Sequence, residues 1–144
     1  MDQLMVKVGD AELECFSHGD GVAIVMLPGG RVTVDYLSDL AEAVAGAGFR
    51  ALRVNPRGAG ASTGPMDGLT LHDLAGDVAG LIQELDLAPG FVLGHAFGNR
   101  IARTRRSGSA RAGARRDARR GGGQGGNSTR GPACLGDAVH ANRL

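Results

Sequence analysis

The sequence predicts an α/β fold for residues 1–103, in which a mostly parallel sheet carries helices on its faces. Three observations lead to this class. The apolar runs at 22–27 and 91–93 do not alternate with polar residues, which is typical of strands buried on both faces. Two stretches with helical periodicity and one further strand lie between these runs. Strands that alternate with helices in this way build parallel sheets.

The chain begins with an expected hairpin. Residues 4–8 and 12–16 are short strand candidates, and the Gly-Asp pair at 9–10 is a turn signal between them. The buried strand at 22–27 follows. It ends at the Pro-Gly-Gly segment 28–30, where backbone without a side chain can approach a ligand closely.

The first helix is expected over 35–45, and the glycines within 46–48 end it. Spacings of three and four residues give this helix an apolar face, composed of Tyr36, Leu37, Leu40, Ala41 and Val44.

The next strand is expected over 49–55, and it opens into a loop rich in glycine and proline, residues 55–65. Loops of this length are often functional. The second helix is expected to start near Thr70, whose hydroxyl can cap it, and Asp73 completes the pattern of a capping box.

The strand at 91–93 leads into Gly94-His95-Ala96-Phe97-Gly98, a turn flanked by glycines and followed by a helix. This is the layout of a nucleophile elbow, G-x-S-x-G, in which a sharp strand-to-helix turn presents a reactive side chain. Ala96 occupies the central position and has neither hydroxyl, thiol nor carboxylate. The sequence therefore predicts the turn without its attacking atom.

With these motifs in this order, residues 3–103 resemble the amino-terminal half of the α/β-hydrolase family. The segment 28–30 corresponds to the family's His-Gly oxyanion segment, with proline in place of histidine. The segment 55–62 corresponds to its Asp-x-Arg-Gly-x-Gly-x-Ser loop, with Asn55 in place of aspartate.

The resemblance implies hydrolysis of an ester, amide or related bond in a small molecule, without a cofactor or a metal. It also implies that the backbone N–H groups of Gly30 and Phe97 would hold the oxyanion. The family's acid and histidine follow strands that this sequence does not show. We therefore expect no catalytic residue here and no serine-type activity, with Ala96 at the nucleophile position.

Four side chains are expected around a pocket between Gly30, Phe97 and the loop 55–65, namely Asn55, Arg57, Ser62 and His95. Arg57 would bind an anionic substrate or tie its own loop to a carbonyl or carboxylate. Ser62 would be a displaced nucleophile or a loop cap. His95 would be a base or a packing residue. For each of these three side chains, the structural role is favoured over the catalytic or binding role.

The composition changes after residue 103. Residues 1–102 contain six Lys and Arg against thirteen Asp and Glu, whereas 103–144 contain ten Arg against two Asp. The segment 104–144 has few large aliphatic residues, so it is expected to be a disordered tail. Such an abrupt switch suggests a frameshift product in place of a native second half.

Two consequences of this tail are expected. Without a sixth strand, residues 91–93 would form an unpaired apolar edge that favours aggregation. His140 has no strand before it and is not expected to act as a catalytic base.

The sequence argues against several partners. The basic tail lacks aromatic residues and any DNA-binding motif, so only non-specific, salt-dependent nucleic-acid binding is expected. No phosphate-binding glycine motif is present. Two unlinked cysteines, no signal peptide and no bilayer-spanning run favour a cytoplasmic protein. The alternative to a hydrolase relative without activity is a non-catalytic small-molecule-binding protein; the substrate and oligomeric state stay open.

Overall fold

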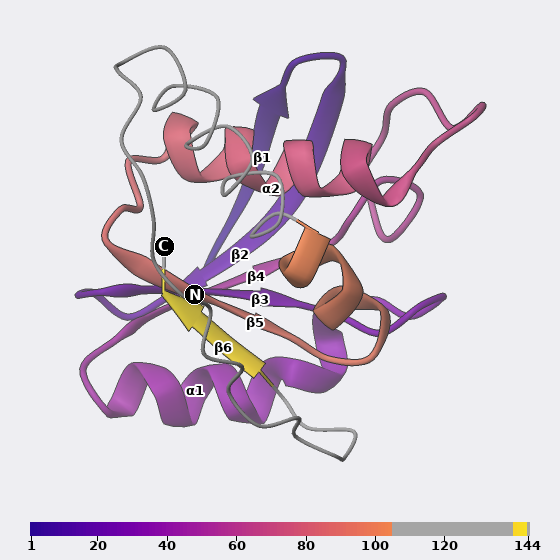
Figure 1. The fold of residues 1–144 in the computed structure, drawn as a ribbon. Helices are drawn as coiled ribbons and strands as arrows, with labels where there is room; N and C mark the ends of the chain where they lie inside the picture. Colours follow the sequence, from indigo (N-terminus) through magenta and orange to yellow (C-terminus); the bar gives the residue numbers. More distant parts are fainter. Residues whose placement is uncertain (105–139, 144) are drawn as a thin grey trace, which may run out of the picture.

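The computed structural model describes residues 1–104 and 140–143, which form one sheet with helices on both faces (Figure 1). The sheet has six strands in the order β1-β2-β4-β3-β5-β6. Their bounds are β1 Asp2–Val8, β2 Ala11–His18, β3 Ala23–Leu27, β4 Arg50–Val54, β5 Gly90–Gly94 and β6 His140–Arg143.

The sheet is mixed. β3 pairs in parallel with β4 and with β5, so the predicted parallel arrangement holds at the centre. The hairpin β1–β2 is antiparallel, as predicted, and β2 joins the central strands by antiparallel pairing with β4. The carboxyl ends of the parallel strands β3, β4 and β5 meet at one edge, where the three motif loops begin.

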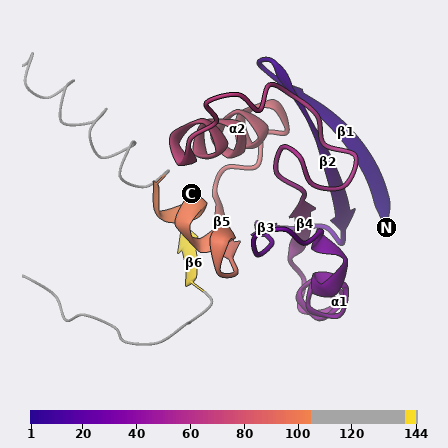
Figure 2. The same ribbon diagram turned by 90° about the vertical axis from the view of Figure 1, so that its right-hand side faces the viewer.

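The two faces of the sheet carry different helices (Figures 1 and 2). The helix α2 (Leu71–Glu84) and the helical residues 97–104 contribute to the larger core cluster. The 3₁₀ turn η1 (Val34–Leu37) and the helix α1 (Ser38–Gly46) lie on the opposite face. The buried side chains of this smaller cluster are Met26, Leu37, Ala41 and Ala51.

The first helix differs from its prediction. Its first turn is the 3₁₀ turn η1, which changes the rotation of the following residues about the helix axis. Leu37 and Ala41 are buried as expected, whereas Tyr36 and Leu40 are 48% and 39% exposed. The predicted apolar face is therefore only partly correct.

The second helix begins as predicted. The Thr70 hydroxyl accepts the Asp73 N–H, and the Asp73 carboxylate accepts the Thr70 N–H, which forms the capping box. The Thr70 hydroxyl also donates to the Asp73 carboxylate at 2.7 Å, and this bond, followed by that from the Thr70 N–H, lowers the pKa of Asp73 below its ordinary value.

The strand β6 corrects one prediction. It pairs antiparallel with β5, with His140 opposite Gly94, so the expected unpaired edge at 91–93 is wrong. The prediction that no strand precedes His140 concerns residues outside the described part of the chain. Residues 105–139 and 144 lie outside the described residues, and the disorder, frameshift and nucleic-acid predictions for the tail stay predictions. Within the described residues, no helix is long and apolar enough to cross a membrane.

Candidate functional site

The turn after β5 has the geometry of an elbow. Ala96 stands at its apex with φ of +46°, a left-handed conformation that is uncommon for residues other than glycine. The turn is fastened to the end of β3, because His95 N–H donates to the Leu27 carbonyl at 3.0 Å and Gly98 N–H to the Pro28 carbonyl at 3.0 Å. Ala96 itself is exposed. The bend therefore presents a methyl group to solvent.

The two glycines that flank the turn are required by close approach. A Cβ atom on Gly98 would lie 2.5 Å from the Leu27 carbonyl oxygen and 2.7 Å from that of Pro28. A Cβ atom on Gly94 would overlap the backbone of Gly98 and Asn99. The two glycines of the sequence pattern are thus required because β5, the helix over 97–104 and the loop after β3 pack closely together.

The expected oxyanion donors are brought to the same place. A Cβ atom on Gly30 would lie 3.5 Å from Phe97 Cβ, so the two segments are in contact. Within the described residues, neither the N–H of Gly30 nor that of Phe97 donates a hydrogen bond to another residue. Two backbone donors are therefore left for a ligand oxygen beside the apex.

Tyr36 joins the two segments that carry these donors. Its hydroxyl accepts the N–H of Gly29 at 2.9 Å and lies 2.9 Å from Nδ1 of His95. The two rings meet edge to face at 5.6 Å. With His95 in its Nε2–H tautomer, the tyrosine proton is donated to Nδ1. His95 is thus a packing and hydrogen-bonding partner, in line with the favoured interpretation.

Sequence reasoning missed Tyr36 as a site residue. Its place in a helical pattern indicated core packing, and only its being the one tyrosine of the chain set it apart.

A cavity of about 320 Å³ lies beside the elbow. Its walls come from the segment 29–33, the segment 56–60, Leu74 and Phe97. The pocket therefore lies between Gly30, Phe97 and the glycine-rich loop. Of the four predicted side chains, Arg57 lines it, and Asn55, Ser62 and His95 do not.

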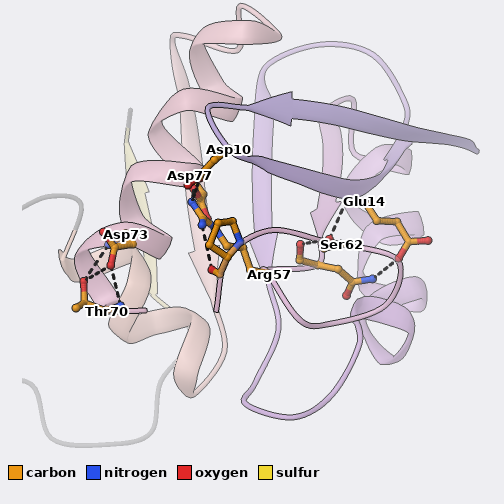
Figure 3. A network of polar contacts seen from close by, with 9 residues as sticks. Asp10, Glu14, Arg57, Ser62, Thr70, Asp73 and Asp77 are labelled. Carbon is orange, nitrogen blue, oxygen red and sulfur yellow. Dashed lines mark hydrogen bonds and ion pairs between the residues drawn. The ribbon is translucent and has the colours of Figure 1, made fainter. Parts of the chain in front are cut away.

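Asn55 and Ser62 are structural residues. Asn55 is buried; its amide donates to Glu14 at 2.8 Å and its amide oxygen accepts the Val34 N–H at 2.9 Å. The Ser62 hydroxyl donates to the Asn55 carbonyl at 2.7 Å and accepts the Glu14 N–H at 2.8 Å (Figure 3). The Ser62 hydroxyl thus donates its proton within its own loop and accepts a hydrogen bond from strand β2, which is the role of a loop cap and not of a displaced nucleophile.

Glu14 is the centre of this network and was not anticipated. Its buried carboxylate accepts the Ala61 N–H at 2.9 Å and the side-chain amides of Asn55 and Gln3, each at 2.8 Å. These bonds, led by that from Ala61, lower the pKa of Glu14 despite the burial that opposes them. Glu14 lies in a hairpin far from the loop in sequence, so no local pattern could have revealed it.

Arg57 anchors the glycine-rich loop 55–65 through ion pairs. Its guanidinium binds both carboxylate oxygens of Asp77 at 2.7 and 2.8 Å, and also reaches Asp10 at 2.9 Å (Figure 3). The hydrogen bonds to Asp77 raise the pKa of Arg57 above its ordinary value, and Asp10 adds to the effect. The favoured interpretation of Arg57 matches this geometry, because two carboxylates already neutralise its charge.

Within the described residues, the Tyr36 hydroxyl is the only hydrogen-bond partner of the His95 ring, so no carboxylate orients this imidazole at the apex. No group of three or more His, Cys, Asp or Glu side chains in this part of the chain is placed to hold a metal ion.

Comparisons with known proteins place this geometry in a family. A family model described as the alpha/beta hydrolase fold matches residues 22–104, which is more than half of the chain. An epoxide hydrolase from Vigna radiata has 24% identity and a TM-score of 0.66, and the match covers 69% of this chain and 32% of that one. A laboratory-evolved variant of potato epoxide hydrolase has 26% identity and a TM-score of 0.66, with coverages of 70% and 33%.

The chain thus spans about a third of the length of these solved structures. A search of curated proteins finds no match. The matched range contains the loop after β3, the glycine-rich loop and the elbow, in the order and positions found in the structure. From this agreement, the chain belongs to the α/β-hydrolase fold family.

Proposed function

We propose that this chain binds a small molecule in the cavity beside the elbow and does not hydrolyse it through the elbow. The observation that carries the proposal is Ala96, whose methyl group stands at the apex with φ of +46°. Nucleophilic catalysis needs a hydroxyl, thiol or carboxylate at that point, and a base that activates it. Neither is found there among the described residues.

The remaining parts of the site favour binding. The free N–H groups of Gly30 and Phe97 are suited to a carbonyl or carboxylate oxygen, the group for which such donor pairs are used in acyl-transfer sites. The cavity of about 320 Å³ accommodates a small organic molecule. Ester or amide compounds of the kind that the family hydrolyses are therefore the first ligands to test.

The test compares the chain with its Ala96→Ser variant on p-nitrophenyl butyrate. We expect neither protein to release p-nitrophenol faster than a buffer blank, because a serine at the apex would still lack an activating histidine and acid. Binding is followed separately from the backbone amide shifts of Gly30, Gly58, Gly60 and Phe97. Catalytic turnover by either protein would overturn the non-hydrolytic proposal. Unchanged shifts with every ester, amide and carboxylic acid tested would overturn the binding proposal.

A further inference from the structure

Arg31 has a backbone conformation that its side chain does not favour. Its φ is +64°, whereas the preceding glycines, Gly29 and Gly30, do not have positive φ. The chain thus places arginine, and not glycine, at the one position of this segment where glycine would relieve strain. A residue kept in a left-handed conformation at a cavity wall points to a role of its side chain.

The charges around the cavity give that side chain a role. The lining residues contain two arginines and no aspartate or glutamate. Arg57 is neutralised by Asp77 and Asp10. Arg31 makes no ion pair and no side-chain hydrogen bond within the described residues. It is therefore the uncompensated cation at the cavity wall.

The rest of the wall is suited to an apolar group. Leu74 is buried in the core and also lines the cavity, and Phe97 and Val32 contribute further apolar surface. Asp35 accepts the Thr33 hydroxyl and is not a lining residue, so it does not cancel the charge of Arg31 inside the cavity.

We infer that the cavity selects a small carboxylic acid with an apolar body, and that Arg31 is the residue that recognises the carboxylate. The inference rests on the proposed binding function and adds to it the charge of the ligand. A guanidinium recognises a carboxylate through charge-assisted hydrogen bonds, which are about twice as strong as neutral ones. A neutral amide of the same shape lacks this interaction.

The test uses matched acid and amide probes. Benzoate, phenylacetate and 4-phenylbutyrate, each with its primary amide, are titrated into the full chain, and Kd is measured from the amide shifts of Gly30, Gly58 and Gly60. We expect each acid to bind about tenfold more tightly than its amide, and Arg31→Gln to remove this difference. Arg100→Gln is the matched control, because Arg100 is exposed and outside the cavity.

A second variant separates recognition from folding. Arg31→Gly relieves the left-handed strain, so it is expected to melt at the same or a higher temperature while it binds the acids about tenfold more weakly. An Arg31→Gly variant that bound the acids as tightly as the wild type would overturn the recognition role of Arg31.

The remaining outcomes distinguish the two proposals. Equal affinity for acids and amides, or equal losses in Arg31→Gln and Arg100→Gln, would overturn the carboxylate inference and leave small-molecule binding intact. If neither acids nor amides shifted any cavity amide, the binding function itself would be overturned. A preference for acids that only Arg31→Gln abolishes supports both.

Discussion

At the scale of single residues, Asn55 illustrates how one substitution depends on a distant neighbour. The family loop that this segment resembles carries an aspartate here, but in this fold the position faces the buried carboxylate of Glu14. An amide can donate to that carboxylate and also accept the Val34 N–H. A second carboxylate could only accept. Asparagine is therefore required by Glu14 and not by the cavity.

The variant Asn55→Asp tests this dependence. It would place two carboxylates in one buried network and remove a donor, so we expect a loss of about 3 kcal/mol in the free energy of unfolding at pH 7. The loss should shrink as the pH falls toward 5, because one of the two groups takes up a proton at a raised pKa. Urea denaturation at both pH values measures it.

The double variant Glu14→Gln/Asn55→Asp is the control. A glutamine amide can donate to the new carboxylate, so most of the lost stability should return at pH 7. If the double variant were no more stable than Asn55→Asp alone, the repulsion between carboxylates would not be the cause.

In the wild-type protein, the contribution of Glu14 to stability decreases as the pH falls, whereas the loss caused by Asn55→Asp is expected to shrink. Because folding lowers the pKa of Glu14 from 4.5, its carboxylate stabilises the fold above that value, and this contribution is lost as the pH falls through the folded pKa. Urea denaturation between pH 6 and 3 should therefore show a steeper decline in wild type than in Glu14→Gln. Parallel curves for the two proteins would contradict the role of Glu14.

At the scale of elements, the glycines of the helices have opposite roles. A Cβ atom on Gly98 would press on the carbonyls of Leu27 and Pro28, whereas one on Gly76, within α2, would meet nothing within 4 Å. We expect Gly98→Ala to destabilise the fold by about 3 kcal/mol through overpacking. Gly76→Ala should stabilise it by about 0.5–1 kcal/mol, because alanine is the better helix former. Thermal unfolding of both variants makes the comparison, and equal shifts would contradict it.

The elements also show what the sequence could predict. The capping box of α2 and the turn of the hairpin depend on residues that are neighbours in the chain, and both were predicted correctly. The 3₁₀ turn η1 rotated Tyr36 out of its predicted apolar face. The pairing of β6 with β5 joins segments almost fifty residues apart, which no local pattern encodes.

The site likewise combines features that local sequence patterns predict with contacts between residues that are distant in the sequence. The pocket between Gly30 and Phe97 was predictable, because each motif follows a buried strand and parallel strands end at one edge of a sheet. The contacts of Glu14 with Asn55, and of Tyr36 with His95, link residues 41 and 59 positions apart. They were not predictable, since they arise from tertiary packing.

At the scale of the whole molecule, Cys15 provides a probe of the core. It is fully buried in β2, and burial raises the pKa of its thiol to about 12. In a Cys134→Ser variant, which leaves one thiol, we expect a disulfide reagent to label Cys15 only as fast as the protein unfolds globally. Labelling rates are compared with unfolding rates in urea, and labelling that outpaces unfolding would contradict the closed core.

The unequal cores on the two faces of the sheet have a dynamic consequence. The α1 face is held by few buried side chains. Buried Arg53 also lies on this face, where its guanidinium donates to the Val34 carbonyl and the Ser38 hydroxyl, but its Nε has no hydrogen-bond partner within the described residues. A buried donor without an acceptor weakens the packing around it. Backbone amides of α1 and η1 should therefore exchange with deuterium before those of α2, in a partial opening that leaves the larger core intact. Since η1 follows directly on the cavity-lining segment 29–33, partial opening of the α1 face would also displace this wall of the cavity.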